Sequence, residues 1–201
     1  MMTSGKLYMF DGPDGVGKTT QFELVAKALR AQGHDVYTTH LLGGTPIGEA
    51  LRSIMFSNAL RPAPTNLHIA LAIYHALAED LEGRRKAGST VLVDRSPLSL
   101  IAYQVYGDGL DPELGAQACR EALAAFSPDQ VILYSAPFEV LQSRRNLRHK
   151  DTDYFEQQQL DYHRRTLEGY QAAAQEYEAT VVAAQGSIDT VHAATMQALN
   201  L

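Results

Sequence analysis

Residues 12–19 restrict the possible folds of this chain more than any other stretch, because they read GPDGVGKT and match the pattern G-x-x-x-x-G-K-[S/T]. Residues 6–10, just before them, read as a short buried strand, and residues 20–31, just after them, carry apolar side chains at helical spacing. A glycine-rich turn between a strand and a helix N-terminus binds phosphate through converging backbone N–H groups and the helix dipole. The sequence therefore predicts a site for a nucleoside triphosphate.

The same loop suggests roles for its individual residues. Lys18 is expected to reach the β- and γ-phosphates, and the Thr19 hydroxyl is expected to bind Mg²⁺. We therefore predict ATP as the phosphoryl donor, together with Mg²⁺. The residues predicted to bind ATP are Gly12, Asp14, Gly15, Val16, Gly17, Lys18, Thr19 and Thr20.

Length and composition fit one α/β domain covering residues 1–201. The 17 basic and 23 acidic residues give a net charge of −6, which argues against a general binder of nucleic acid or of membrane surfaces. Cys119 is the only cysteine, so no internal disulfide can form and we expect a cytoplasmic location. We expect no signal peptide, since the first strand starts within ten residues, and no apolar run approaches membrane length.

Predicted strands alternate with predicted helices along the whole chain. The strands are expected at 6–10, 35–40, 90–93, 130–134 and 180–184, and the helices at 20–31, from 46, at 66–85, from 98, up to 126, at 137–145, at 153–177 and from 189, with a loop at 107–112. Residues 90–93 are continuously apolar, which is typical of a parallel strand covered on both faces. We therefore predict an α/β fold with a five-stranded parallel sheet, helices on both faces, and ligands at the carboxyl ends of the strands.

Asp94 and Arg95 directly follow the apolar strand at 90–93, at the edge where ligands are expected. An aspartate there can hold a Mg²⁺-bound water, and an arginine can bind phosphate through two parallel hydrogen bonds. The alternative is that Asp94 only caps a helix and Arg95 lies on the surface. With a phosphate loop upstream we favour the functional interpretation, in which Thr19 and Asp94 form the metal site.

The segment 144–150 carries three arginines, one lysine and one histidine. A basic run of this kind is usually a solvated surface. Because it lies between two helices of a predicted nucleotide-binding protein, we interpret it as a short mobile lid at about 144–152. Its arginines, Arg144, Arg145 and Arg148, would stabilise charge on the transferring phosphoryl group.

Five segments resemble the thymidylate kinase family of P-loop nucleoside monophosphate kinases, in the same order and spacing. They read FDGPDGVGKTT at 10–20, GGTPIGEALR at 43–52, DR at 94–95 with AYQ at 102–104, the stretch at 128–144, and DYFE at 153–156 with GY at 169–170. The first is generic to many NTPases, whereas the second and third are much more specific. The resemblance implies a P-loop kinase fold, ATP-dependent phosphorylation of a deoxynucleoside 5′-monophosphate, and a homodimer formed through helices.

The resemblance also implies roles in the acceptor site. Asp14 would contact the 3′-hydroxyl of the acceptor sugar, Arg95 would bind the acceptor phosphate, and Tyr103 would pack against the sugar. Asp153 and Glu156 would flank Arg95 and the acceptor. Bacterial-type members place their catalytic arginines in the lid rather than in the phosphate loop, which agrees with the lid proposed above. The predicted catalytic residues are Lys18, Arg95, Arg144, Arg145 and Arg148.

The chain departs from the family's pattern around the expected base pocket. The sequence HLL at 40–42 stands where the family usually has Arg-Glu-Pro. Counting back from residues 88 and 94, Ala70 stands where the family has a stacking Phe, and Tyr74 where it has a base-contacting Arg. Leu100 stands where it has a polar residue. The predicted substrate-binding residues are Asp14, His40, Gly44, Ala70, Tyr74, Arg95, Ser99, Leu100, Tyr103, Asp153 and Glu156.

Two interpretations of these departures stay open. The chain is either a divergent thymidylate kinase whose helix register at 66–85 has been misassigned, or a kinase for a non-thymine or modified nucleoside monophosphate with an altered base pocket. A third hypothesis is a nucleotide-binding regulator without acceptor phosphorylation, against which the retained acceptor-site residues argue. The helix at 66–85 is apolar around much of its circumference, so we expect it to form a largely apolar homodimer interface.

Overall fold

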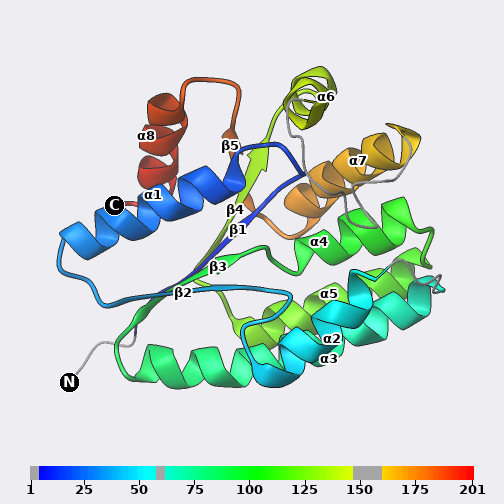
Figure 1. The fold of residues 1–201 in the computed structure, drawn as a ribbon, viewed down its shortest axis with the longest axis horizontal. Helices are drawn as coiled ribbons and strands as arrows, with labels where there is room; N and C mark the ends of the chain where they lie inside the picture. The colour runs from blue at the N-terminus through cyan, green and yellow to red at the C-terminus, as the bar shows by residue number, and fades with distance from the viewer. Residues whose placement is uncertain (1–4, 58–61, 147–159) are drawn as a thin grey trace.

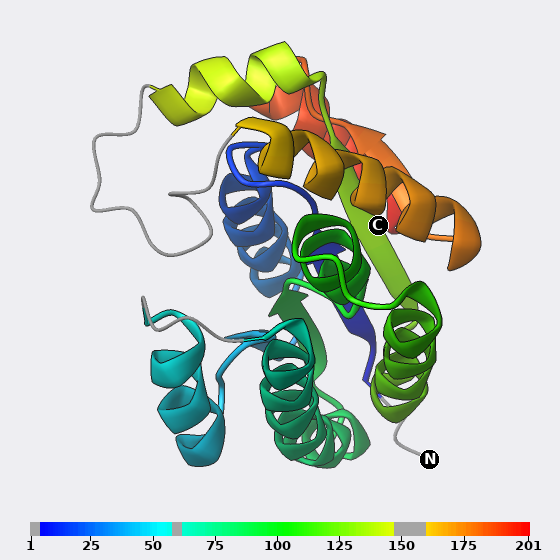
Figure 2. The same cartoon turned by 90° about the vertical axis from the view of Figure 1, so that its right-hand side faces the viewer.

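The computed structural model describes residues 5–57, 62–146 and 160–201. Within these residues lies a parallel five-stranded sheet of order β2-β3-β1-β4-β5 (Figures 1 and 2). Its strands are β1 (Leu7–Asp11), β2 (Val36–His40), β3 (Thr90–Asp94), β4 (Gln130–Ser135) and β5 (Thr180–Ala183). The predicted α/β class and the five parallel strands are confirmed.

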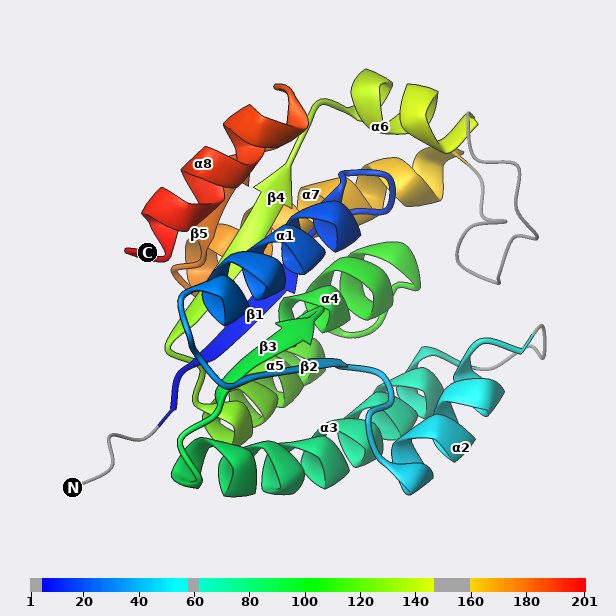
Figure 3. The same cartoon turned by 60° about the vertical axis from the view of Figure 1, so that its left-hand side comes forward.

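Helices cover both faces of the sheet (Figures 1 and 3). One face packs against α1 (Lys18–Ala31) and α8 (Ile188–Ala198). The other packs against α3 (Ala63–Lys86), α5 (Pro112–Phe126) and α7 (Leu160–Glu176). The remaining described helices are α2 (Pro46–Met55), α4 (Leu98–Leu100), the π-helix η1 (Ile101–Gly107) and α6 (Phe138–Asn146).

The central strand β1 shows why the sheet is apolar on both faces. Leu7 and Met9 belong to the core cluster that includes α3 and α5, whereas Tyr8 and Phe10 belong to the cluster that includes α1 and α8. Because side chains alternate along a strand, a strand covered on both sides needs an apolar residue at nearly every position. Asp11 is the exception, and it stands where β1 meets the candidate site.

Three neighbouring strands end at the same edge of the sheet. Phe10 of β1 pairs with Asp94 of β3, and Asp94 pairs with His40 of β2. The loop that leaves β1 at this edge leads directly into α1 (Figure 1). The parallel sheet therefore gathers the phosphate loop and the carboxyl ends of β2 and β3.

The segment after β3 differs from the regular helix expected from residue 98. After the three residues of α4 the chain continues as a π-helix, in which the backbone N–H of Asp108 donates to the carbonyl of Tyr103 at 2.8 Å. Turns of this width are rare and often occur at functional sites. Tyr103, a predicted substrate-binding residue, lies in η1.

The apolar face of α3 is satisfied within a single chain. Ile73 and Leu77 are fully buried, and α3 packs against α2 and α5 as well as against the sheet. On the outer side, His68 and His75 are exposed, and His75 lies 2.8 Å from Glu121 of α5. One sheet face therefore does not cover all the apolar surface of this helix, and in the described residues α2 and α5 cover more of it. The homodimer itself stays a prediction.

The lid and the start of the last long helix fall largely outside the described residues. Of the predicted lid at 144–152, only 144–146 are described, as the end of α6. The described part of the helix expected at 153–177 is α7, which begins at Leu160. Within the described residues, no helix is long and apolar enough to cross a membrane.

Candidate active site

The loop between β1 and α1 has a backbone that requires glycine. Gly12, Gly15 and Gly17 have φ angles of 141°, 86° and 97°, which residues with side chains rarely adopt. At Gly12 a Cβ atom would also lie 2.5 Å from the carbonyl oxygen of Tyr134. These glycines turn the chain into α1, whose first N–H groups have no partner within the helix and can bind phosphate.

Lys18 begins α1 and reaches the end of β3. Its Nζ lies 3.0 Å from Oδ1 of Asp94, and its side chain is only 9% exposed. Burial and the positive charge of Arg95 lower the pKa of Lys18, against the opposing effect of Asp94 and Asp14. The lowered pKa means that the local negative charge does not fully compensate the ammonium, and a bound phosphate would supply what is missing.

Arg95 holds an uncommon backbone conformation, with a φ of 82°. Left-handed non-glycine residues concentrate at functional sites. Its Nη1 donates to the carbonyl of Gly12 at 2.8 Å and to the hydroxyl of Tyr170 at 2.6 Å. Its Nη2 donates to Oδ1 of Asp14. The guanidinium is thereby fixed beside the phosphate loop.

Asp14 links Arg95 to the π-helix η1. Its second oxygen, Oδ2, accepts a hydrogen bond from the Tyr103 hydroxyl at 2.9 Å. Burial favours the neutral acid, but the charges of Arg95 and Lys18 hold the pKa of Asp14 below its usual value. Asp14 is therefore a carboxylate at neutral pH, able to orient Arg95 and to accept a hydrogen bond from a ligand hydroxyl.

Asp11 is a fully buried carboxylate surrounded by hydrogen-bond donors. Its Oδ2 accepts from the backbone N–H and the hydroxyl of Ser96, at 3.0 and 2.8 Å, and from the N–H of Ser99 at 3.1 Å. Its Oδ1 accepts from the N–H of Gly12 at 2.8 Å and from the hydroxyl of Tyr170 at 3.0 Å. A buried charge needs such partners, and here they tie β1 to the segment after β3.

A cavity of about 250 Å³ opens where these groups meet. The predicted site residues that line it are Asp14, Gly15, Val16, Gly17, Lys18, Thr19, His40, Asp94 and Arg95. Pro13, Leu42, Arg52 and Phe56 complete the lining. We call this the acceptor-side cavity. The structure brings together the predicted phosphate, metal and acceptor-phosphate residues, although their roles stay predictions.

Arg52 of α2 adds a cation to this cavity that sequence reasoning missed. Its Nη1 donates to the carbonyl of Leu42 at 2.7 Å, and its guanidinium carbon lies 4.5 Å from the centroid of the Phe56 ring. The segment GGTPIGEALR at 43–52, which ends on this arginine, was the available signal. Nothing in its helical spacing indicates that the side chain turns back toward the phosphate loop.

His40 is the last residue of β2, and Gly44 lies in the turn between β2 and α2. His40 Nε2 lies 3.0 Å from Oε1 of Glu49, and the same oxygen accepts a hydrogen bond from the N–H of Gly44 at 2.9 Å. Gly44 has a φ of 74° and shapes the turn rather than lining the acceptor-side cavity. Glu49 therefore holds the turn in the geometry that presents His40 to the cavity.

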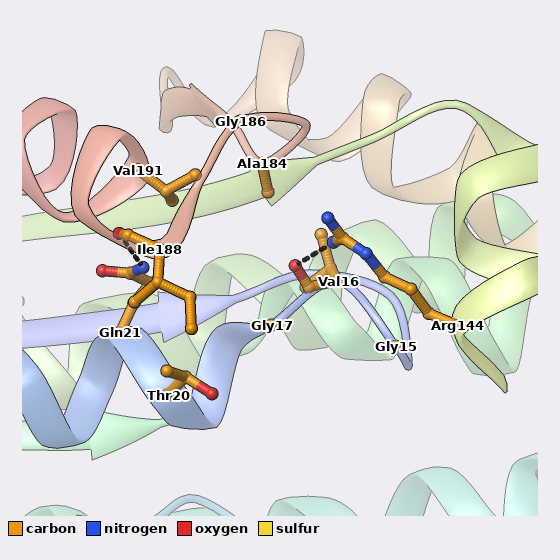
Figure 4. Close-up of a pocket in the computed structure, with 10 residues that line it drawn as sticks. All are labelled: Gly15, Val16, Gly17, Thr20, Gln21, Arg144, Ala184, Gly186, Ile188 and Val191. Carbon is orange, nitrogen blue, oxygen red and sulfur yellow. Dashed lines mark hydrogen bonds between the residues drawn. The ribbon is translucent and has the colours of Figure 1, made fainter. Parts of the chain in front are cut away.

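A second cavity, of about 330 Å³, lies on the other side of the phosphate loop (Figure 4). Its lining comes from the loop and α1, from α6, and from the β5–α8 connection and the start of α8. It comprises Gly15, Val16, Gly17, Thr20, Gln21, Arg144, Ala184, Gly186, Ile188 and Val191. We call this the donor-side cavity. Arg144 Nη1 donates to the carbonyl of Val16 at 3.0 Å, so α6 is attached to the loop. The β5–α8 connection carries no sequence motif, so the sequence does not predict its place in the site.

The remaining predicted catalytic arginines divide between described and undescribed residues. Arg145 lies at the end of α6 close to the loop, since a Cβ on Gly15 would come within 3.4 Å of its Cγ. Arg148, Asp153 and Glu156 lie outside the described residues, and their roles stay predictions.

The three residues on which the altered-pocket hypothesis depends lie in the core. Ala70 and Leu100 are fully buried, and Tyr74 is 2% exposed with its ring 6.2 Å from that of Phe126. None of them lines either of the two cavities. Ser99, predicted to bind substrate, instead bonds the buried carboxylate of Asp11. The described geometry gives no support to a rebuilt base pocket at these positions.

Thr19 and Asp94, the predicted metal residues, both line the acceptor-side cavity. Hydroxyl and carboxylate oxygens are the ligands that Mg²⁺ prefers. Within the described ranges no group of three or more His, Cys, Asp or Glu side chains could hold an ion. This pair fits an ion that takes most of its ligands from water and phosphate, as Mg²⁺ commonly does.

A phosphate loop between two cavities, with a buried lysine and a fixed arginine, defines a P-loop phosphotransferase. Residues 10–195 match the family model for thymidylate kinase, and the chain belongs to this family. The thymidylate kinase of Thermomicrobium roseum is 37% identical over 167 residues, covering 83% of this chain and 80% of the relative. That of Nostoc punctiforme is 33% identical over 189 residues, covering 92% and 89%. A crystal structure of thymidylate kinase from Ehrlichia chaffeensis shares the fold, with a TM-score of 0.77 at 22% identity, covering 98% of this chain and all of that one.

Proposed function

We propose that this protein transfers the γ-phosphoryl group of ATP to thymidylate (dTMP), which yields dTDP and ADP. Membership of the thymidylate kinase family supports the reaction. The observation that carries the proposal is the placement of Arg95, fixed by Gly12 and Asp14 on a cavity that also contains Lys18. A protein that only binds ATP needs no such acceptor-phosphate site.

On the acceptor side, Arg95 binds the 5′-phosphate of dTMP and Asp14 accepts a hydrogen bond from the sugar 3′-hydroxyl. Tyr103, which donates to Asp14, packs against the sugar. The attacking atom is an oxygen of a phosphate monoester, whose second pKa is about 6, so it is already ionised at neutral pH. The enzyme therefore needs no general base, and its main tasks are positioning and charge neutralisation.

On the donor side, the adenosine of ATP occupies the cavity under the β5–α8 connection, and its phosphates follow the loop into α1. Lys18 and the lid arginines Arg144, Arg145 and Arg148 neutralise charge on the transferring group. The loop separates the two cavities, which share Gly15, Val16 and Gly17, so donor and acceptor approach from opposite sides. Direct in-line transfer follows, without a covalent enzyme intermediate.

Thr19 and Asp94 would hold Mg²⁺ beside the phosphates. The ion would supply positive charge that offsets the negative charge of the phosphates during transfer. Lys18, which forms an ion pair with Asp94, places its ammonium next to this position. We further propose a cytoplasmic homodimer, on the basis of the family resemblance and the single cysteine.

The test is a coupled assay of ADP release with a panel of acceptors: dTMP, dUMP, dCMP, dGMP, AMP and a thymidylate modified at the base. We expect release to require both an acceptor and Mg²⁺, and kcat/KM to be highest for dTMP. Efficient turnover of the modified thymidylate with weak turnover of dTMP would instead support the altered-pocket hypothesis. ATP binding without acceptor-dependent ADP release would support the regulator.

A further inference from the structure

We propose that Tyr170 is a positioning residue for Arg95 and that its hydroxyl sets the affinity for the acceptor monophosphate. The inference rests on the function proposed above. Tyr170 lies in α7, remote in sequence from the phosphate loop, and is 1% exposed. It lines neither of the two cavities, so it acts through the arginine and does not touch the ligand.

The Tyr170 hydroxyl lies between a cation and a carboxylate. Arg95 Nη1 lies 2.6 Å from it, Asp11 Oδ1 lies 3.0 Å from it, and Ser99 Oγ lies 2.9 Å from it. Arginine can only donate, so the phenol oxygen accepts from Arg95. Its single proton is then free to bond Asp11. The result is a series of hydrogen bonds in which the guanidinium donates to the hydroxyl and the hydroxyl donates to the carboxylate.

This series of hydrogen bonds keeps the Arg95 guanidinium from pairing directly with the Asp11 carboxylate. Nη1 of Arg95 lies 3.5 Å from Oδ1 of Asp11, beyond a normal hydrogen bond but within reach of an ion pair. Without the hydroxyl, the buried carboxylate loses one donor and the guanidinium loses one acceptor. Each is then stabilised by moving toward the other, which draws Arg95 inward and away from the cavity.

The glycine next to Tyr170 lets α7 approach η1 closely enough for the Tyr170 hydroxyl to contact Arg95. A Cβ at Gly169 would lie 2.8 Å from Cα of Ala102 and 2.9 Å from Cβ of Tyr106, so only glycine allows α7 to approach η1 so closely. The ring of Tyr170 meets that of Tyr103 edge to face, with centroids 5.9 Å apart. Both tyrosines therefore hold the Arg95–Asp14 pair, one from each helix.

The first experiment compares Tyr170→Phe with Tyr134→Phe in steady-state kinetics. Tyr134 is an equally buried tyrosine whose hydroxyl bonds Thr195, on the other face of the sheet. Losing a buried hydrogen bond to a charged group should raise KM for dTMP about tenfold in Tyr170→Phe, with KM for ATP unchanged within about twofold. Tyr134→Phe should change neither KM. Equal KM values for dTMP in Tyr170→Phe and the unmodified protein would overturn the inference, as would an equal rise in both KM values.

The second experiment asks whether Tyr170 acts through Arg95. Dissociation constants for dTMP are measured by calorimetry for Tyr170→Phe, Arg95→Lys and the double variant. If Tyr170 only positions Arg95, Tyr170→Phe should raise the dissociation constant for dTMP by less than about twofold in the Arg95→Lys background. Effects that multiply independently would assign Tyr170 a general structural role and reject the proposal.

A third measurement needs no variant at position 170 and covers the case in which Tyr170→Phe does not fold. In the unmodified protein, ¹⁵N NMR of the Arg95 side chain, assigned with Arg95→Lys, should show separate Nη signals because rotation of the guanidinium is restricted. A single averaged Nη signal would overturn the inference. Failure of the unmodified protein to phosphorylate dTMP would reject the proposed function, whereas normal turnover together with unaffected Tyr170→Phe kinetics would reject only the role of Tyr170.

Discussion

The two sides of the phosphate loop are built differently. On the acceptor side, charged and hydroxyl side chains hold one another, as in the contacts of Arg95 with Asp14 and Tyr170. On the donor side, the lining is mostly backbone, glycine and aliphatic side chains (Figure 4), and Arg144 and Gln21 bond backbone carbonyls. The difference suggests that acceptor recognition depends on individual side chains, whereas donor recognition depends on the shape of the backbone.

This contrast has an energetic consequence. Removing one partner from a buried network of charges leaves the others unsatisfied, which costs more than the lost hydrogen bond alone. A backbone-lined cavity loses little when one side chain changes, since its carbonyls and N–H groups remain in place. Substitutions on the acceptor side should therefore have larger effects than those on the donor side, and effects specific to one substrate.

The largest effect is expected for Lys18, which lines the acceptor-side cavity and is predicted to reach the β- and γ-phosphates of the donor. Lys18→Ala removes the cation aimed at the β- and γ-phosphates and should lower kcat by about a thousandfold or more. The fold should persist, because the ammonium is held with a lowered pKa and is not part of the apolar core. The kinetics of ADP release measures kcat, and thermal melting measures whether the fold persists. Lys27→Ala, at an exposed position of α1, is the matched control and should be nearly neutral; near-normal turnover in Lys18→Ala would refute the donor-site assignment.

The next largest effect is on the stability of the protein. A substitution at Tyr74 tests whether this side chain belongs to a base pocket or to the core. Burial is the main cause that raises the pKa of this tyrosine, and the same burial disfavours a new cation at this position. Tyr74→Arg should destabilise the protein by about 3–5 kcal/mol, because it buries an unpaired cation. Denaturant unfolding measures the change, with Tyr74→Phe as the conservative control. A stable Tyr74→Arg variant with a gain in thymidylate turnover would restore the altered-pocket hypothesis.

The sequence was sufficient for the fold and the phosphate loop because both depend on local patterns. The glycines at 12, 15 and 17 indicate a backbone that other residues rarely adopt, and continuously apolar strands indicate a sheet covered on both faces. Asp11 and Tyr170 lie in segments that resemble the family, but no local pattern gives their roles, because these arise only when β1, α7 and the segment after β3 pack together. The position of Ala70 was inferred by counting back from residues 88 and 94, and such counting cannot fix which side of a helix faces the site.

Asp14 gives an acceptor-side effect of intermediate size. Asp14→Asn keeps the shape but removes the charge that holds Arg95, and should lower kcat/KM for dTMP by about thirtyfold with little change in KM for ATP. An equal loss of kcat/KM for dTMP and for ATP would argue against separate recognition on the two sides of the loop. The same variant tests the lowered pKa of Asp14.

A carboxylate whose pKa is lowered on folding contributes stability above its unfolded pKa, near 4, and loses it as the pH falls through the folded value. The stability difference between the unmodified protein and Asp14→Asn should therefore be largest at neutral pH and shrink below about pH 4. Denaturant unfolding from pH 3 to 7 measures it. A difference independent of pH would mean that Arg95 and Lys18 do not stabilise the charged form.

The smallest effect is expected at Gln21, on the donor side. Its Nε2 donates to the carbonyl of Ile188 at 2.9 Å and ties α1 to the β5–α8 connection. Gln21→Leu roughly preserves the volume of this buried side chain and removes one hydrogen bond between neutral groups, whose net contribution is about 1 kcal/mol. KM for ATP should rise only about threefold, with KM for dTMP unchanged. Gln130→Leu is the matched control, since Gln130 bonds the carbonyl of Ala198 at 2.8 Å at the opposite end of α8 and should alter neither KM. A rise in KM for ATP as large as the loss seen for dTMP in Asp14→Asn would mean that donor recognition depends on side chains as strongly as acceptor recognition does.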